Sequence, residues 1–296
     1  MLGEVTVVGC GLIGGSLVKS LRARASASRL YAIDQERVLA AARPYIDDAA
    51  TPASARGTEL LARSELVVLA VPVGAIMTSL TWVLDSMGAD AVVTDTGSVK
   101  KPVVAAAAQH ARGSRFIGGH PMAGREIGGF EAASPDLFEG ARWFLVAGAP
   151  GATGNGPDAF ERAASLARAV GGVPARIDAD AHDRAMAYVS HVPQLLASAL
   201  FAVAARAGVL GEAGPGFRDM TRISGGPSSI WRDIFEANRE HIGAALGCIL
   251  EPLEELKKGL ARGDEDAIVA AVALLEQAHA ARPAPPTPEA KGKSDP

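Results

Sequence analysis

Hydrophobic residues in the first half of the chain alternate between short β-branched runs and longer stretches with helical spacing. Residues 4–9 read EVTVVG, which is typical of a strand buried on both faces. Residues 11–24 follow, with Leu12, Leu17 and Leu21 recurring on one side of a predicted helix. Further strands are predicted at residues 29–33, 66–70, 91–93, 116–117 and 142–147. Strands that alternate with helices predict an open α/β sheet of parallel strands.

The pattern changes after about Ile177. Between residues 180 and 279 almost no strand signal remains, and apolar residues recur at helical spacing, as at Ile242 and Leu246. Pro252 lies inside this run, and a kink or break is expected there because proline removes a helical hydrogen bond. The second half of the chain is therefore predicted to be helical throughout.

The bulk composition excludes several classes of protein. Of the 296 residues 48% are hydrophobic and 21% are charged, and the net charge of −4 is too mild to favour nucleic acid or an anionic membrane as partner. The longest apolar run, residues 67–77, contains Pro72 and Gly74 and is too short to span a bilayer. Cys10 and Cys248 form neither a disulfide framework nor a CxxC metal pair, so we expect a cytoplasmic protein without a metal site.

A glycine-rich turn follows the first predicted strand. Residues 9–14 read GCGLIG, the G-x-G-x-x-G spacing, and this spacing alone is weak in a chain with 33 glycines. Its context is stronger, because it follows a buried strand, opens a helix, and precedes Asp34 at the end of the second strand. Gly9 permits the turn, Gly11 lets the backbone approach a pyrophosphate, and Gly14 allows close packing of helix on strand. The helix N-terminus offers free N–H groups to phosphates.

The carboxylate of Asp34 can accept hydrogen bonds from both ribose hydroxyls and would repel a 2′-phosphate, which favours NAD over NADP. A glycine-rich corner without ligand is the alternative, and nothing downstream resembles a flavin-binding half. The residues expected to bind the cofactor are Gly9, Gly11, Leu12, Ile13, Gly14, Asp34, Val71, Pro72 and Thr96. The sequence thus predicts a Rossmann-type, mostly parallel sheet domain at 1–177, an all-helical domain at 178–280, and a disordered proline-rich tail at 281–296.

Polar clusters accompany the later elements. TDTGSVK at 94–100 and GGHPMAGRE at 118–126 each follow a predicted strand, where residues face the ligand crevice of a parallel sheet. The predicted helices carry HD at 182–183, SHVPQ at 190–194 and FRDMTRI at 217–223. These clusters are expected to lie beside the nicotinamide and the substrate.

Taken together, these segments resemble the prephenate and arogenate dehydrogenase family. The matching segments are GxGxxGGS at 9–16, AVPV at 70–73, TDTGSVK at 94–100, GGHPMAGRE at 118–126, HDRAMAYVSHVP at 182–193, FRDMTRI at 217–223 and WRDIF at 231–235. The resemblance covers roughly residues 4–260 in order. It implies an enzyme of tyrosine biosynthesis that oxidises and decarboxylates prephenate, or its amino analogue arogenate, with NAD⁺. It also implies a homodimer formed through the helical domain.

The resemblance implies roles for particular residues. His120 would accept the hydrogen bond of the ring hydroxyl as a neutral imidazole, and Ser98 would hold His120 and the hydroxyl in register. Arg222 would pair with a substrate carboxylate, because a guanidinium matches that anion with two hydrogen bonds. An ion pair of Arg222 with Asp219 or Asp233 is the structural alternative.

His191 and Gln194 are the other expected substrate-binding residues. His182 and His191 lie nine residues apart, so a regular helix would place them on roughly opposite faces, with at most one touching ligand. Some family members carry a histidine where this chain has Gln194, and an amide cannot supply positive charge. The choice among prephenate, arogenate and an amino-substituted prephenate therefore stays open.

Two other functions remain possible on the sequence. A β-hydroxyacid dehydrogenase has a similar layout but uses a helical lysine, and no lysine occurs between Lys101 and Lys257. A non-catalytic NAD-binding sensor would keep the glycines and Asp34 but would need neither Ser98 nor His120.

Overall fold

The computed structural model describes residues 1–125, 127–147, 157–226 and 228–282. The chain divides into two compact units, residues 1–243 and 244–296, which are described separately. The first unit holds the sheet and the first helices of the predicted helical half. The division expected at residue 177 stays a prediction, and most of the tail expected at 281–296 lies outside the described residues.

An eight-stranded sheet with the order β3-β2-β1-β4-β5-β6-β7-β8 forms the first half of the chain. Its strands are β1 (Leu2–Val8), β2 (Ala27–Ile33), β3 (Asp48–Ala50), β4 (Leu66–Leu69), β5 (Val92–Asp95), β6 (Phe116–Pro121), β7 (Arg142–Val146) and β8 (Val173–Arg176). Neighbouring strands are parallel except β6 and β7, which are antiparallel. Val8 pairs with Ile33 and Leu69, and Leu69 pairs with Asp95, so β1, β2, β4 and β5 end at one edge.

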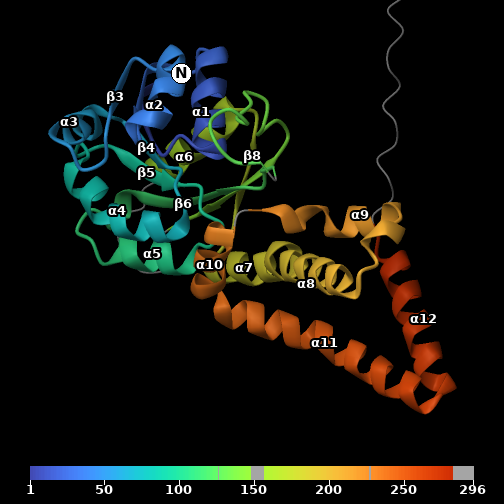
Figure 1. Cartoon of the computed structure of the whole chain (residues 1–296). Coiled ribbons are helices and arrows are strands. Elements are labelled where there is room, and N and C mark those ends of the chain that lie inside the picture. The colour runs from blue at the N-terminus through green and yellow to red at the C-terminus, as the bar shows by residue number, and fades with distance from the viewer. Residues whose placement is uncertain (126, 148–156, 227, 283–296) are drawn as a thin grey trace, which may run out of the picture. The chain divides into compact units, whose positions relative to one another are not determined.

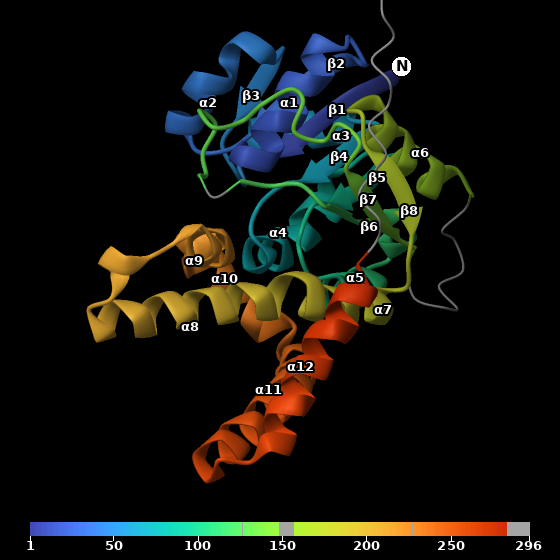
Figure 2. The same cartoon turned by 90° about the vertical axis from the view of Figure 1, so that its right-hand side faces the viewer.

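Helices cover both faces of this sheet (Figures 1 and 2). One core joins the sheet to α1 (Leu12–Ala23), α2 (Glu36–Ala42) and α6 (Pro157–Ala169). The core on the other face joins it to α3 (Ala55–Arg63), α4 (Val73–Ser86) and α5 (Lys101–Ala108). The β-branched runs have no polar face because successive residues of a strand point into opposite cores, both dry. The mostly parallel sheet followed by helices confirms the predicted fold class.

The described residues that follow β8 are helical, as predicted. They comprise α7 (Ala179–Met186), a π-helical turn (Ala187–His191), α8 (Val192–Ala207), α9 (Pro215–Thr221), α10 (Ser228–Ala237), α11 (Arg239–Arg262) and α12 (Glu265–Ala280). The carboxylate of Asp178 begins α7 by accepting the backbone N–H groups of Asp180 and Ala181, and Gly208, at φ +74°, ends α8.

The structure departs from the sequence reading in several places. The short strands β3 and β8 were missed because DAA and VPAR carry no apolar run. A kink or a break was expected at Pro252, and α11 continues through it without a break. His120 was expected beyond a strand but lies within β6, because antiparallel pairing with β7 extends that strand to Pro121.

One helical stretch is long and apolar enough to resemble a membrane span. Residues Ala179–Ala207 have the length and mean hydropathy, 1.4, of a membrane span. Helices of soluble proteins pass the same test, so composition does not assign this stretch to a membrane. Only 33% of its apolar window is buried within the chain, which leaves much apolar surface for a partner.

The second unit contains most of α11, from Ala244 onward, and all of α12. The two helices pack closely where the chain reverses, because a Cβ on Gly259 would lie 2.0 Å from the Cβ of Ala267. Gly263 makes the reversal with φ +67°, and the side chain of Asp264 caps α12 by accepting the N–H of Asp266. Apolar side chains of α12, such as Val269 and Leu275, are exposed.

Candidate active site

The glycine turn has the geometry that a bound dinucleotide requires. Gly9 has φ +91°, and a Cβ there would lie 2.5 Å from the carbonyl oxygen of Ala70. A Cβ on Gly14 would lie 1.8 Å from the carbonyl oxygen of Gly9, so α1 packs against the turn only without a side chain. Nothing lies within 4 Å of a Cβ on Gly11, which therefore faces the open side where a pyrophosphate could approach.

The carboxylate of Asp34 is fixed beside this turn. Its Oδ2 accepts the backbone N–H of Cys10 at 2.6 Å, and its Oδ1 accepts that of Gln35 at 2.6 Å. Burial, with a smaller contribution from the Asp34 charge, raises the pKa of the Cys10 thiol to about 12, so this thiol stays neutral. The arrangement presents a carboxylate and not a thiolate to a ribose.

The other expected cofactor residues gather at the same edge. Leu12 and Ile13 form the first turn of α1, while Val71 and Pro72 lie between β4 and α4. The backbone N–H of Thr96 donates to the carbonyl of Leu69 at 3.1 Å, which ties the loop after β5 to β4. The edge where β1, β4 and β5 end therefore collects every segment expected to bind the dinucleotide.

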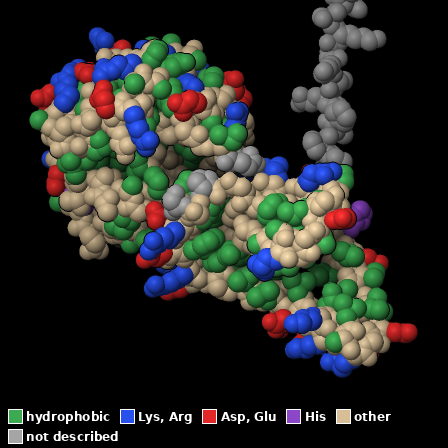
Figure 3. Space-filling view, viewed as in Figure 1, with side chains coloured by type: hydrophobic (Ala, Val, Ile, Leu, Met, Phe, Trp, Pro, Cys, Tyr) green, Lys and Arg blue, Asp and Glu red, His purple; other side chains and the backbone are tan. Residues whose placement is uncertain are grey.

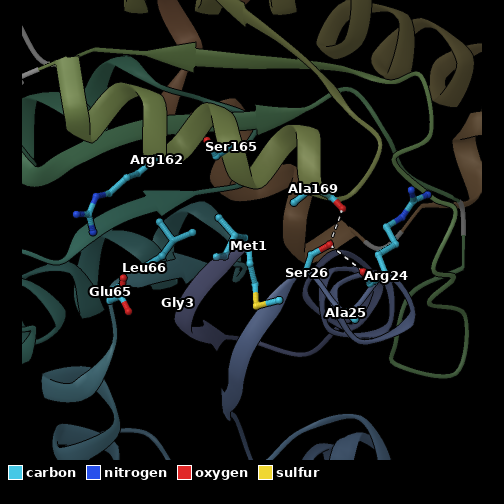
Figure 4. A pocket seen from close by; sticks show the side chains of 11 residues that line it. Met1, Gly3, Arg24, Ala25, Ser26, Glu65, Leu66, Arg162, Ser165 and Ala169 are labelled. Carbon is cyan, nitrogen blue, oxygen red and sulfur yellow. Dashed lines mark hydrogen bonds between the residues drawn. The ribbon is translucent and has the colours of Figure 1, made fainter.

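A cavity of about 650 Å³ lies at the opposite edge of the sheet. Figure 4 shows Met1, Gly3, Glu65 and Leu66 lining it at the starts of β1 and β4. Open α/β sheets bind ligands at the other edge, beyond the carboxyl ends of the strands, so this cavity is not the candidate site.

Beside the nucleotide edge lies a chain of three buried side chains. His120 on β6 places its Nδ1 2.9 Å from Nε2 of His182 on α7. Nδ1 of His182 lies 2.7 Å from Oδ1 of Asp183. An ionised carboxylate only accepts, so His182 carries its proton on Nδ1 and presents a bare Nε2. His120 must then donate from Nδ1, which leaves its own Nε2 as a hydrogen-bond acceptor.

The carboxylate of Asp183 is held by the start of α5. Its Oδ1 accepts the backbone N–H of Lys100 at 2.7 Å, and its Oδ2 accepts that of Lys101 at 2.8 Å. Only 1% of Asp183 is exposed, so these bonds and the helix dipole replace water around the charge. The carboxylate is thereby oriented before any ligand binds.

Lys100 forms a second buried ionic group. Its Nζ donates to Asp95 and, at 2.7 Å, to the carbonyl of Gly119, and both charged side chains are fully buried. Asp95 also accepts the N–H groups of Gly97 and Gly119 at 2.8 and 2.9 Å. The pair therefore fastens β5 to β6 one residue before His120. Burial lowers the pKa of Lys100 against the opposing effect of Asp95.

The three histidines of this region are held neutral. Burial, followed by the charges of His182 and Lys100, lowers the pKa of His120 well below 6.5. Burial also lowers the pKa of His182, which the hydrogen bond to Asp183 only partly opposes, and it lowers that of His191 to about 4. An imidazole that stays uncharged near neutral pH can accept a proton from an alcohol.

His191 is also buried here, and the expectation that it lies on the helix face opposite His182 stays a prediction. That expectation assumed a regular α-helix, whereas the π-helical turn at Ala187–His191 has a longer period and changes the angle between His182 and His191. Both rings have 0% exposure, and both influence the pKa of His120. Nδ1 of His191 faces the side-chain nitrogen of Asn238 at 3.1 Å.

Three expected site residues lie outside this cluster of hydrogen bonds. Ser98 is half-buried in the loop after β5, and Gln194 on α8 directs its Nε2 to Ser198 Oγ at 3.4 Å. Arg222 lines a cavity of about 470 Å³. The other residues lining that cavity are Ser198, Phe201, Arg218, Thr221, Ser224 and Gly225.

His182, Asp183 and Asn238 are the residues whose roles sequence reasoning missed. His182 and Asp183 form a polar pair in the sequence, but the contact of His182 with His120 on β6 forms only when α7 packs against that strand. Asn238 follows α10 without any motif. Asp233, considered as a partner of Arg222, accepts the backbone N–H of Gly74 at 3.0 Å and so connects α10 to α4.

A doubly wound sheet with a glycine turn at the carboxyl edge, next to neutral buried imidazoles, defines a dinucleotide-dependent dehydrogenase. Two family models match the chain. Residues 17–175 match the prephenate dehydrogenase nucleotide-binding domain, and residues 178–274 match the prephenate dehydrogenase dimerization domain. The chain belongs to the prephenate dehydrogenase family of NAD-dependent enzymes.

Individual relatives agree with this assignment. The chain is 29% identical to the prephenate dehydrogenase of Lactococcus lactis subsp. cremoris over 278 residues, which cover 90% of this chain and 73% of that protein. A crystal structure of prephenate dehydrogenase from A. aeolicus with hydroxyphenyl propionate and NAD⁺ matches with a TM-score of 0.82 and 30% identity, covering 94% and 97% of the two chains. Synechocystis arogenate dehydrogenase matches with a TM-score of 0.76 and 26% identity, covering 93% and 97%.

Proposed function

We propose that this chain is a prephenate dehydrogenase that forms 4-hydroxyphenylpyruvate and CO₂ with NAD⁺ in tyrosine biosynthesis. The observation that supports this proposal is the chain of hydrogen bonds from Asp183 through His182 to His120. This chain of hydrogen bonds leaves a neutral acceptor nitrogen on His120. His120 lies on β6, which is the neighbour of β5 in the sheet. An alcohol oxidation needs such an acceptor on the hydroxyl.

In the proposed reaction Nε2 of His120 takes the proton of the ring hydroxyl. Bound NAD⁺ would supply the acceptor for the hydride from the carbon that carries this hydroxyl. Loss of CO₂ then makes the ring aromatic, so the protein mainly has to align the alcohol and hold its proton. As His120 becomes charged, His182 accepts a stronger hydrogen bond from its Nδ1–H, and the charge of Asp183 is transmitted through His182.

Four other residues complete the proposed site. Asp34 accepts the ribose hydroxyls, and Ser98 holds His120 and the substrate hydroxyl in register. Arg222 pairs with a substrate carboxylate, and its cavity of about 470 Å³ has room for such a group. Gln194 contributes an uncharged amide to the substrate side.

The lysine-dependent alternative is disfavoured by the chemistry of Lys100. The amine of Lys100 is held by Asp95 and the carbonyl of Gly119, and the amine of the neighbouring Lys101 is held by Asp180. A buried ammonium that donates two hydrogen bonds lacks the free lone pair that a base requires. His120 is therefore the proposed base.

Arogenate is the second candidate substrate. Gln194 is the residue that supports arogenate as a candidate. Its buried amide carries no charge and directs its nitrogen to Ser198. An uncharged amide can bond the keto acid of prephenate or the amino acid of arogenate, because it both donates and accepts. The similarity to an arogenate dehydrogenase fits the same proposal.

We also propose that the enzyme is a cytoplasmic homodimer formed through its helices. Figure 3 shows hydrophobic side chains gathered on the surface of the helical half. They include Leu200, Phe201 and Val203 on α8, and Met220 on α9, which are all exposed. An apolar surface of this kind is typical of a protein interface, and the matching dimerization domain supports that use.

The proposed function is tested by comparing kcat/KM for prephenate and arogenate, each with NAD⁺ and NADP⁺. The proposal expects the highest value for prephenate with NAD⁺. A higher value for arogenate would replace the proposed substrate. Absence of NADH formation with either substrate, in protein that binds NAD⁺, would contradict the proposed activity.

A further inference from the structure

Asn238 is a buried polar residue that the proposed reaction does not use. It lies between α10 and α11, and only 3% of it is exposed. Its backbone N–H donates to the carbonyl of Ile234 at 3.0 Å, and its carbonyl accepts the N–H of Ile242 at 3.0 Å. The backbone on both sides is therefore fixed, which orients the side chain.

The amide of Asn238 bonds to two groups at once. Its Nδ2 lies 2.8 Å from the carbonyl oxygen of Asp183 and 3.1 Å from Nδ1 of His191. A carbonyl oxygen only accepts, so the amide atom that faces it is the nitrogen, with two N–H groups to donate. The second N–H makes Nδ1 of His191 an acceptor, and the neutral ring must then carry its proton on Nε2.

The resulting Nε2–H of His191 is a buried hydrogen-bond donor. His191 has 0% exposure, and its Nε2 has no hydrogen-bond partner in the part of the chain that the structure describes. Buried donors in native proteins nearly always have an acceptor, so a donor left over at a binding site indicates a ligand atom. The ring of Trp231 lies edge-on to His191 with centroids 6.3 Å apart, and the titratable groups that interact with His191 are Asp183, His182 and His120.

We propose that Asn238 is a positioning residue that fixes His191 as a hydrogen-bond donor to a carbonyl or carboxylate oxygen of a bound ligand. The inference rests on the proposed function, because two ligands of that reaction offer such an oxygen. One source is the side chain or ring carboxylate of the substrate, and the other is the carboxamide of the nicotinamide.

Asp183 sets opposite roles for two histidines. Its carboxylate fixes His182, which makes Nε2 of His120 an acceptor for the alcohol. Its backbone carbonyl fixes Asn238, which makes Nε2 of His191 a donor. One residue thereby prevents either imidazole from adopting the tautomer that would repel its ligand group.

The tautomers can be measured without any activity. In the free enzyme labelled with ¹⁵N-histidine, the nitrogen shifts are expected to place the proton of His191 on Nε2 and those of His120 and His182 on Nδ1. The variant His191→Gln assigns the His191 signals. A proton on Nδ1 of His191 would overturn the inference even if the enzyme oxidises prephenate, and the expected tautomers would stand even if the proposed substrate were wrong.

A pair of variants at His191 identifies the ligand. His191→Phe keeps a ring but removes the donor, and we expect KM for one ligand to rise about 5- to 150-fold, which is the 1–3 kcal/mol of an unpaired buried partner converted at 1.4 kcal/mol per tenfold. His191→Gln, whose amide nitrogen can occupy the place of Nε2, is expected to restore most of that loss. If only KM for prephenate rises, His191 bonds to the substrate. If only KM for NAD⁺ rises, His191 bonds to the carboxamide of the nicotinamide. Unchanged KM values for both would overturn the inference.

The variant Asn238→Asp tests the positioning role itself. A carboxylate at residue 238 accepts a hydrogen bond from Nδ1–H of His191, so Nε2 of the neutral ring becomes bare. Protonation of the ring restores the donor, and KM of this variant is therefore expected to rise as pH increases through the new pKa of His191, a limb absent from the wild type. If KM of the Asn238→Asp variant does not change with pH, while its thermal unfolding matches the wild type, the positioning role of Asn238 is contradicted. Should this variant fail to fold, Asn238→Ala with the ¹⁵N measurement decides the same point.

Discussion

Replacing His182 by phenylalanine tests the hydrogen-bonded chain behind His120. The ring of His182 lies edge-on to Phe144 and His120, with centroids 5.6 and 5.1 Å away, so phenylalanine preserves most of the packing. It removes Nε2, the acceptor 2.9 Å from Nδ1 of His120. The substitution therefore deletes the two hydrogen bonds of His182, to His120 and to Asp183, and leaves the shape of the site.

The magnitude follows from the charge that His120 acquires. During the reaction its Nδ1–H becomes part of an imidazolium, and a hydrogen bond to a charged group contributes about 1.5–3 kcal/mol. At about 1.4 kcal/mol per tenfold, kcat is expected to fall about 10- to 150-fold. The dissociation constant of NAD⁺ is expected to stay unchanged, because the glycine turn and Asp34 do not contact His182.

The assay follows NADH formation by absorbance at saturating prephenate, with thermal unfolding measured alongside. His182→Gln is the matched control, because its amide oxygen can accept from His120 and its amide nitrogen can donate to Asp183. We expect this variant to stay within about tenfold of the wild-type kcat, since it keeps hydrogen bonds on both sides. Wild-type kcat in the phenylalanine variant, or an equal loss in both variants, would refute the reasoning.

Three further results are expected. Asp34→Ser should weaken NAD⁺ binding and narrow the gap to NADP⁺, because a hydroxyl does not repel a 2′-phosphate, and an unaltered ratio of the two dissociation constants would disprove this role. Arg222→Ala should chiefly raise KM for prephenate with a smaller change in kcat, whereas an unchanged KM would make Arg222 structural. Lowering pH from 7 to 5 should destabilise the fold, since the unfolded chain protonates His191 at its ordinary pKa while the folded pKa is about 4. This residue contributes about 2 kcal/mol of that loss, which denaturant unfolding of His191→Gln should lack.

The fold could be predicted wherever burial alone dictates the residue pattern. The run VTVV in β1 is β-branched because both of its faces meet a core. The turn after it needs Gly9 because this residue has φ +91°, and it needs Gly14 because a side chain there would collide with the carbonyl of Gly9. The strands β3 and β8 were missed because DAA and VPAR are only partly buried and bear no such pattern.

The candidate site was predictable in its segments but not in its contacts. TDTGSVK and GGHPMAGRE were placed at the ligand edge, yet the ion pair of Lys100 with Asp95 depends on how β5 and β6 lie together. The π-helical turn that ends at His191 has no sequence signal, so a regular helical period does not describe the path from His182 to His191. Asn238 acquires its partners only when the end of α10 lies against α7 and the π-helical turn.

The central claim is that a neutral His120 takes the proton of the substrate hydroxyl. The direct test is the single-turnover rate of NADH formation by His120→Asn with prephenate and saturating NAD⁺. The account predicts a rate about 10² to 10⁴ times lower than wild type, with an unchanged dissociation constant for NAD⁺. A rate near that of the wild type would contradict it.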